Sequence, residues 1–158
     1  MSQRDRIPVE ETGEIVAKTV PDQLVVNGIV GDGAVVSLQV RGGMNRGTAF
    51  LFEIHGEQGD LQLTATSRAS MQRQELNVRG ARGDEKELAK LPVPSKFRWV
   101  PGGISSDSRY NVAQLYARVA ESIRDSKPVS PDFDAAVTRH HLIDAIVRAS
   151  EMGVKQVV

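Results

Sequence analysis

Three polar side chains near the end of the chain are the first candidates for chemistry: His140, His141 and Asp144. His140 and Asp144 are four residues apart, a spacing that places an imidazole and a carboxylate on one helical face. Such a pair can orient a general base, but it can equally make ordinary hydrogen bonds on a solvated helix. An enzyme built on these three side chains would need a cleft around them.

Other signals of catalysis or metal binding are missing from the sequence. There is no H-E-x-x-H motif, and His55 precedes a glycine at the end of a predicted strand. The chain has no cysteine, which excludes thiol nucleophiles, disulfides and iron–sulfur clusters. We therefore assign no catalytic residue and no metal ligand.

Glycine-rich loops that bind nucleotides form the next class of candidate. Gly28, Gly31 and Gly33 follow the order G-x-x-G-x-G, which is not the G-x-G-x-x-G fingerprint of dinucleotide-binding domains. A Walker-type G-x-x-x-x-G-K-[ST] is also absent. The sequence predicts no cofactor-binding residue and no Rossmann domain in this chain.

Two glycine-flanked segments are candidates for binding a small molecule. Arg41 precedes two glycines, and Tyr110 and Asn111 follow a Pro-Gly-Gly loop that also has Trp99 beside it. Loops with large polar or aromatic side chains often line ligand sites. We name Arg41, Tyr110 and Asn111 as candidate substrate-lining residues. Trp99 either lines this site or seals the packing of helices on a sheet.

The charge pattern argues against a nucleic-acid partner. Lysine and arginine together number 20, as do aspartate and glutamate, so the formal net charge is zero. A mildly basic stretch has no interleaved aromatic residues and is typical of a solvated sheet edge. Its arginines are Arg68, Arg73, Arg79 and Arg82. We interpret the tripeptide Arg82-Gly83-Asp84 as a solvated turn.

The hydrophobic pattern argues against a membrane partner. No apolar run approaches the roughly 18 residues that a spanning helix requires, and the amino-terminal segment is polar rather than signal-like. We therefore expect a cytoplasmic protein. A chain of 158 residues is about the size of one domain.

The sequence predicts that the candidate residues are positioned by a sheet followed by helices. After an entry segment at 1–22, residues 23–91 contain about six β-type runs separated by glycine turns, such as the Asp-Gly turn at 32–33. A loop at 92–107 leads to helical periodicity over 108–153, which predicts two helices. The expected fold is a single α+β domain, an open and largely antiparallel sheet backed by two C-terminal helices.

The predicted strands suggest that this sheet is covered on more than one side. Residues 24–30 are apolar on both faces. In residues 48–54 one face carries the phenylalanines, and the other face is partly apolar. Two helices can cover one side, so we expect the other side to meet a second domain or a second subunit. A single curved sheet closing on itself is the alternative.

Two segments, in this order, resemble a known family. They are EIHGEQGDLQL at 53–63 and PDFDAAVTRHHLIDAIVRASEMG at 131–153. With the segments between and before them, they are similar to the C-terminal domain of the glucose-fructose oxidoreductase, inositol dehydrogenase and rhizopine-catabolism (Gfo/Idh/MocA) family. The most similar branch contains the yeast galactose-regulon repressor.

The resemblance implies an NAD(P)-dependent sugar or polyol oxidoreductase, in which a separate N-terminal Rossmann domain binds the cofactor. The second domain shapes the substrate pocket, and its sheet commonly makes the subunit interface. The family's glycine fingerprint and its E-K-P lysine are absent here, since Asp84-Glu85-Lys86 is followed by glutamate. The family's catalytic helix, which carries an aspartate and a histidine, also has no match in this sequence. This chain is thus expected to be inactive by itself.

Two functions remain open at this point. The chain is either the substrate-pocket and oligomerisation domain of such an oxidoreductase, or a stand-alone dimerisation or ligand-sensing module without catalysis. Its expected partners are a second copy through the sheet face, an N-terminal Rossmann domain, and a sugar-like small molecule. Met1 is either a natural start or the result of truncation.

Overall fold

The computed structural model describes residues 5–43, 46–66, 74–103, 108–129 and 131–158. The chain divides into two compact units. The first comprises Met1–Met44 and Ile146–Gln156, and the second comprises Asn45–Ala145 and Val157–Val158.

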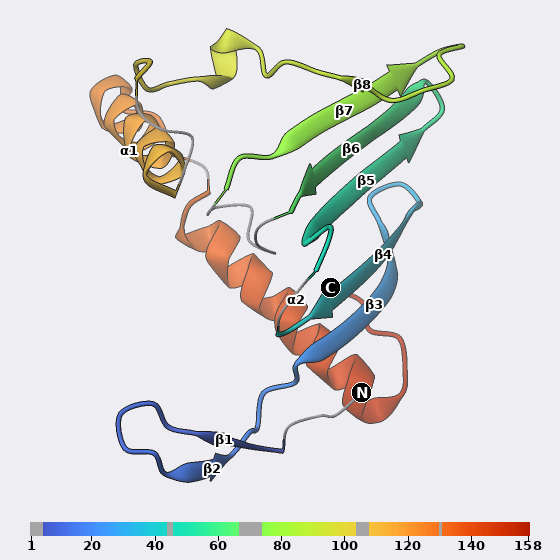
Figure 1. Cartoon of the computed structure of the whole chain (residues 1–158), viewed down its shortest axis with the longest axis vertical. Coiled ribbons are helices and arrows are strands. Elements are labelled where there is room, and N and C mark those ends of the chain that lie inside the picture. Colours follow the sequence, from blue (N-terminus) through green and yellow to red (C-terminus); the bar gives the residue numbers. More distant parts are fainter. Residues whose placement is uncertain (1–4, 44–45, 67–73, 104–107, 130) are drawn as a thin grey trace. The chain divides into compact units, whose positions relative to one another are not determined.

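The first unit begins with a short hairpin that the sequence did not predict. Strands β1 (Arg6–Pro8) and β2 (Ile15–Ala17) pair in antiparallel register, as Figure 1 shows in dark blue. The amide of Gly13 donates to the carbonyl oxygen of Val9 at 2.8 Å, and the φ of Gly13 is +69°. Strands of three residues are too short to give a recognisable alternating pattern, which is why this segment reads as an entry loop.

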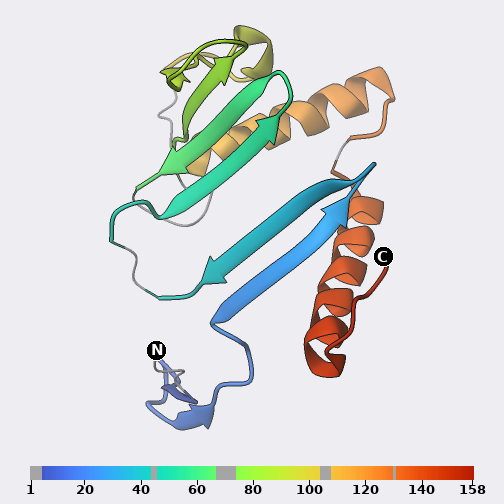
Figure 2. The same cartoon turned by 90° about the vertical axis from the view of Figure 1, so that its right-hand side faces the viewer.

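Strands β3 (Gln23–Val30) and β4 (Ala34–Arg41) form the long ribbon of the first unit (Figure 2). The predicted Asp-Gly hairpin is confirmed, and its two glycines, Gly31 and Gly33, have φ values of +53° and +113°. Pairs such as Val26 with Leu38 make one face of the ribbon apolar. The other face is mixed: Asn27 lies opposite Ser37. The ribbon is therefore less apolar on one side than the sequence suggested.

The second unit contains a four-stranded antiparallel sheet in the order β5-β6-β7-β8 (Figure 1). Its strands run Phe50–Gly56, Gly59–Ala65, Asn77–Arg82 and Ala89–Lys90. The edge strand β8 is only two residues long, although Leu91 extends it by donating its amide to the Val78 carbonyl oxygen at 2.9 Å. A short charged edge discourages pairing with other chains.

Both helices lie at the C-terminal end of the chain. A 3-10 turn at Ser95–Phe97 precedes α1 (Ser108–Asp125), and α2 spans Phe133–Met152. The Asp132 carboxylate caps α2 by accepting the amide of Ala135 at 2.9 Å. Gly153, with φ of +66°, ends this helix as its position predicts.

The predicted fold class is confirmed: the strands are antiparallel and two helices follow them. The partition of the strands differs from the expected single sheet, because hydrogen bonding divides the eight described strands into sheets of two, two and four. Within the described ranges, neither helix is long and apolar enough to cross a bilayer.

Candidate functional site

The three candidate substrate-lining residues fall in two places. Arg41 is the last residue of β4 in the first unit and pairs across the ribbon with Gln23. Tyr110 and Asn111 are half-buried in the first turn of α1 in the second unit. Their role in binding a substrate stays a prediction.

The histidines do not form a metal site in the described part of the chain. His140, His141 and Asp144 are all exposed on α2. His55 lies elsewhere, on β5, with its Nδ1 3.0 Å from the Asp60 carboxylate across the hairpin. Among the described residues, no group of three histidine, aspartate or glutamate side chains is placed to hold a metal ion.

One face of the four-stranded sheet is apolar across all its strands. Because successive side chains alternate and paired residues share a face, the register collects these side chains on one surface. We call this surface the apolar face; its members are Phe50, Phe52, Ile54, Leu61, Leu63, Val78 and Leu91. Phe52 and Ile54 each expose 47% of their surface. The sheet therefore presents a continuous apolar area that is only half covered.

The opposite face of this sheet is polar. Gln62 donates to the Glu53 carboxylate at 2.8 Å, beside the pairing of His55 with Asp60. On the next strand, Arg79 donates to the Leu88 carbonyl oxygen at 2.7 Å. These cross-strand bonds suit a solvated surface. The sequence indicated apolar side chains on both faces, and the register shows that in this sheet only one face requires a cover.

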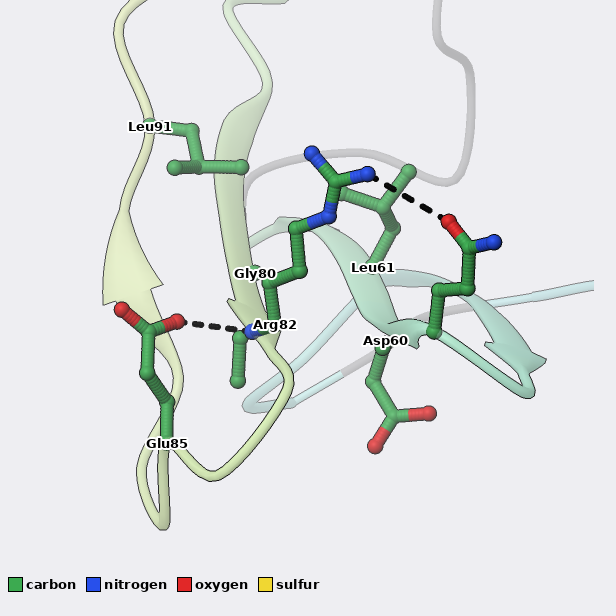
Figure 3. A pocket seen from close by; sticks show the side chains of 9 residues that line it. Asp60, Leu61, Gly80, Arg82, Glu85 and Leu91 are labelled. Carbon is green, nitrogen blue, oxygen red and sulfur yellow. Dashed lines mark hydrogen bonds between the residues drawn. The ribbon is translucent and has the colours of Figure 1, made fainter.

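An open hollow of about 330 Å³ lies where the apolar face meets the two hairpin ends of the sheet (Figure 3). Its lining residues are Gln58, Gly59, Asp60, Leu61, Gly80, Ala81, Arg82, Glu85 and Leu91. We call it the hairpin-end hollow. Leu61 is the register partner of Gly80, and both share a face with Arg82.

Gly80 gives the side chains of Leu61 and Leu91 room to lie above it at the wall of this hollow. A Cβ atom at this position would come within 2.7 Å of Leu91 Cδ1 and 2.9 Å of Leu61 Cδ2, closer than real side chains approach. The two leucines therefore occupy the room that any larger residue would need. This role could not be predicted, because a glycine inside a strand indicates that some group approaches closely but does not indicate which one.

Trp99 is 44% exposed and lies beside α1. The Gln114 side chain of α1 accepts the amides of Trp99 and Val100 at 2.8 and 2.9 Å and donates to the Phe97 carbonyl oxygen at 2.9 Å. The Arg118 guanidinium lies 4.9 Å from the centre of the Trp99 ring. Trp99 thus packs against α1, and Gln114, which sequence reasoning missed, holds the loop in place.

Of the four arginines that suggested a solvated edge, Arg79 and Arg82 lie within the described residues. Arg68 and Arg73 lie outside the described residues. Arg79 bonds the neighbouring loop, as above, while Arg82 ends β7. The turn after Arg82 is exposed, and Gly83 adopts a φ of +61° there. The interpretation of Arg82-Gly83-Asp84 as a solvated turn is consistent with this geometry.

The glycine turns do not fit a nicotinamide dinucleotide. Such a cofactor needs a glycine loop between a strand and a helix, so that the helix N-terminus meets the pyrophosphate. Gly31 and Gly33 lie instead between two antiparallel strands, and Gly59 is the first residue of strand β6, directly after such a turn. Among the described residues, these turns lead into strands and not into a helix.

Comparison with known proteins identifies the first part of the chain. Residues 5–65 match the family model described as Gal80p, C-terminal domain. The resemblance expected from the sequence is confirmed for this segment, which has the C-terminal domain type of Gfo/Idh/MocA-like and Gal80-like proteins. The match includes the motif at 53–63 and ends before that at 131–153. No curated protein and no solved structure matches the chain.

Proposed function

We propose that this chain is the substrate-pocket and oligomerisation domain of an NAD(P)-dependent sugar or polyol oxidoreductase, and that it is inactive by itself. The observation that carries the proposal is the match of residues 5–65 to the Gal80p C-terminal domain model. In this proposal a separate Rossmann domain holds the NAD(P), which supplies hydride transfer. The proposed location is the cytoplasm.

The oligomerisation role is supported by the apolar face of the four-stranded sheet. Large apolar patches are rare on monomeric proteins and usually mark association surfaces. Phe52, Ile54 and Leu63 lie at the middle of this face. On the opposite face, polar side chains already form hydrogen bonds with one another. We propose that a second copy of the chain covers this middle part of the apolar face.

Cofactor titration tests the division of labour between domains. Calorimetry of the full chain with NAD⁺ and with NADP⁺ is expected to give no saturable heat, because its glycine turns do not fit the pyrophosphate. A dissociation constant in the micromolar range for either nucleotide would contradict the proposal.

A second function is favoured by the identity of the matching model. The matching family model is that of the Gal80p C-terminal domain, and the branch that the sequence resembles contains a repressor. The chain could therefore act as a stand-alone dimerisation or ligand-sensing module. The coding sequence upstream of the Met1 codon distinguishes the two functions. An in-frame glycine fingerprint supports the oxidoreductase, and a nearby stop codon supports the module.

A further inference from the structure

We propose that the hairpin-end hollow binds a small carboxylate whose body is a single apolar ring or a short branched chain. The proposal rests on the walls of the hollow and the charges at its rim. It does not depend on NAD(P), on a second domain or on the oxidoreductase assignment.

The walls of the hollow select an apolar body. Leu61 and Leu91 face one another across Gly80, which contributes no side chain (Figure 3). Leu61 is 40% exposed and Leu91 is 39% exposed, so a ligand seated here would remove apolar surface from water. A volume of about 330 Å³ is at the small end of ligand pockets and suits one ring.

The rim of the hollow selects a negative charge. The Arg82 guanidinium has five donors and, among the described residues, makes one hydrogen bond, to Gln58 Oε1 at 3.3 Å. In the described part of the chain no carboxylate forms an ion pair with it. In Figure 3 the Arg82 side chain extends between Leu61 and Leu91. This cation lies at the end of an apolar surface and keeps donors for a ligand.

The two carboxylates of the lining are occupied elsewhere. Glu85 accepts the backbone amide of Arg82 at 2.7 Å, and Asp60 pairs with His55 on the polar side of the sheet. Figure 3 shows both carboxylates turned away from the guanidinium. Arginine and carboxylate groups match in a bidentate geometry. The carboxylate of an organic ligand can therefore bind the Arg82 guanidinium at the rim, while the apolar body of the ligand contacts the leucine walls.

Benzoate is the probe that combines both features. We expect its titration into the ¹⁵N-labelled full chain to shift the amide signals of Gly80, Ala81 and Arg82 with a dissociation constant of about 1–10 mM. Acetate, which has the charge without the ring, and benzyl alcohol, which has the ring without the charge, are each expected to bind at least tenfold more weakly. Equal binding of acetate and benzoate, or shifts spread over the whole chain, would overturn the proposal.

Three variants separate the charge from the walls. Arg82→Gln is expected to weaken benzoate at least tenfold without changing benzyl alcohol, since a charged hydrogen bond is lost. Gly80→Val is expected to abolish both, because its side chain would displace Leu61 and Leu91, the two apolar walls. Glu85→Gln is expected to tighten benzoate by removing a like charge near it. Arg98→Gln, a cation outside the hollow, is the matched control and should bind as the wild type.

Two controls keep the result decisive. A well-dispersed spectrum shows that each variant is folded. If Gly80→Val does not fold, Arg82→Gln alone still tests the proposal. The titrations use a protein concentration at which sedimentation shows a monomer, so failure of ligand binding and failure of association are observed separately. Unchanged benzoate affinity in folded Arg82→Gln would overturn the proposal.

Discussion

Gly59 at the β5–β6 turn is the position where a single methyl group should damage the sheet most. Its φ is +150°, a backbone conformation that residues with a side chain rarely adopt. A Cβ atom there would overlap the backbone carbonyl oxygen of Ala81 and come within 3.0 Å of Arg82 Cα. Both atoms belong to the main chain of β7, so they can move only if the strand pairing opens.

The expected cost of Gly59→Ala follows from these two terms. Overpacking against fixed atoms costs about 1–3 kcal/mol, and a disfavoured backbone conformation costs about 1–3 kcal/mol more. The smaller entropy of the unfolded alanine chain offsets about 0.4–1 kcal/mol. The net loss of unfolding free energy is therefore about 3 kcal/mol.

Gly56→Ala is the matched control for this substitution. Gly56 and Gly59 are register partners at the same turn, but a Cβ at Gly56 would meet only the Gly59 carbonyl oxygen, at 3.4 Å. This is close to an ordinary contact, and we expect a change within about 1 kcal/mol.

Urea unfolding followed by the fluorescence of Trp99, the single tryptophan, measures both variants within the second unit. With a slope of about 1–3 kcal/mol per molar urea, Gly59→Ala should lower the midpoint by about 1 M or more, and Gly56→Ala by much less. Equal midpoints for the two variants would refute the reasoning, because they share the turn and differ only in backbone conformation and contact.

Two further predictions concern side chains that join segments of the chain. Gln114→Ala should speed hydrogen exchange of the Trp99 and Val100 amides, whereas Gln114→Glu, which still accepts both amides, should protect them. Equal exchange in both variants would count against the anchoring of this loop by Gln114. The hydrogen bond from Lys18, at 2.8 Å, lowers the pKa of Asp22 below 3.8. Lys18→Gln should therefore raise the Asp22 pKa in a carboxyl NMR titration, and the stability that this pair adds near neutral pH is lost as the pH falls through the folded pKa.

The sequence predicted the strands whose pattern is local. Residues 23–30 and 34–41 form the expected hairpin because the Asp-Gly turn and the flanking valines act together. The alternation of Phe50, Phe52 and Ile54 also predicted which side chains share a face. Local patterning determines these features, and no distant contact is needed to find them.

Features that depend on pairing register could not be found in this way. The polarity of the opposite sheet face comes from β6 and β7, where Gln62 and Arg79 lie beside β5 only after the register is set. The hairpin-end hollow depends on Gly80 meeting Leu61 and Leu91, which are far apart in the sequence. The anchoring of Trp99 by Gln114 likewise joins a loop to a helix. Sequence spacing contains no information about such contacts.

The association of the chain through its apolar face is the central claim, and sedimentation of two opposite substitutions tests it directly. Ile54 lies on the apolar face, and Leu51, which is 55% exposed on the same strand, lies on the other face. We predict that wild type and Leu51→Glu sediment as an oligomer, and that Ile54→Glu sediments as a folded monomer. A wild-type monomer at high concentration, or the same loss of association in both variants, would contradict the account.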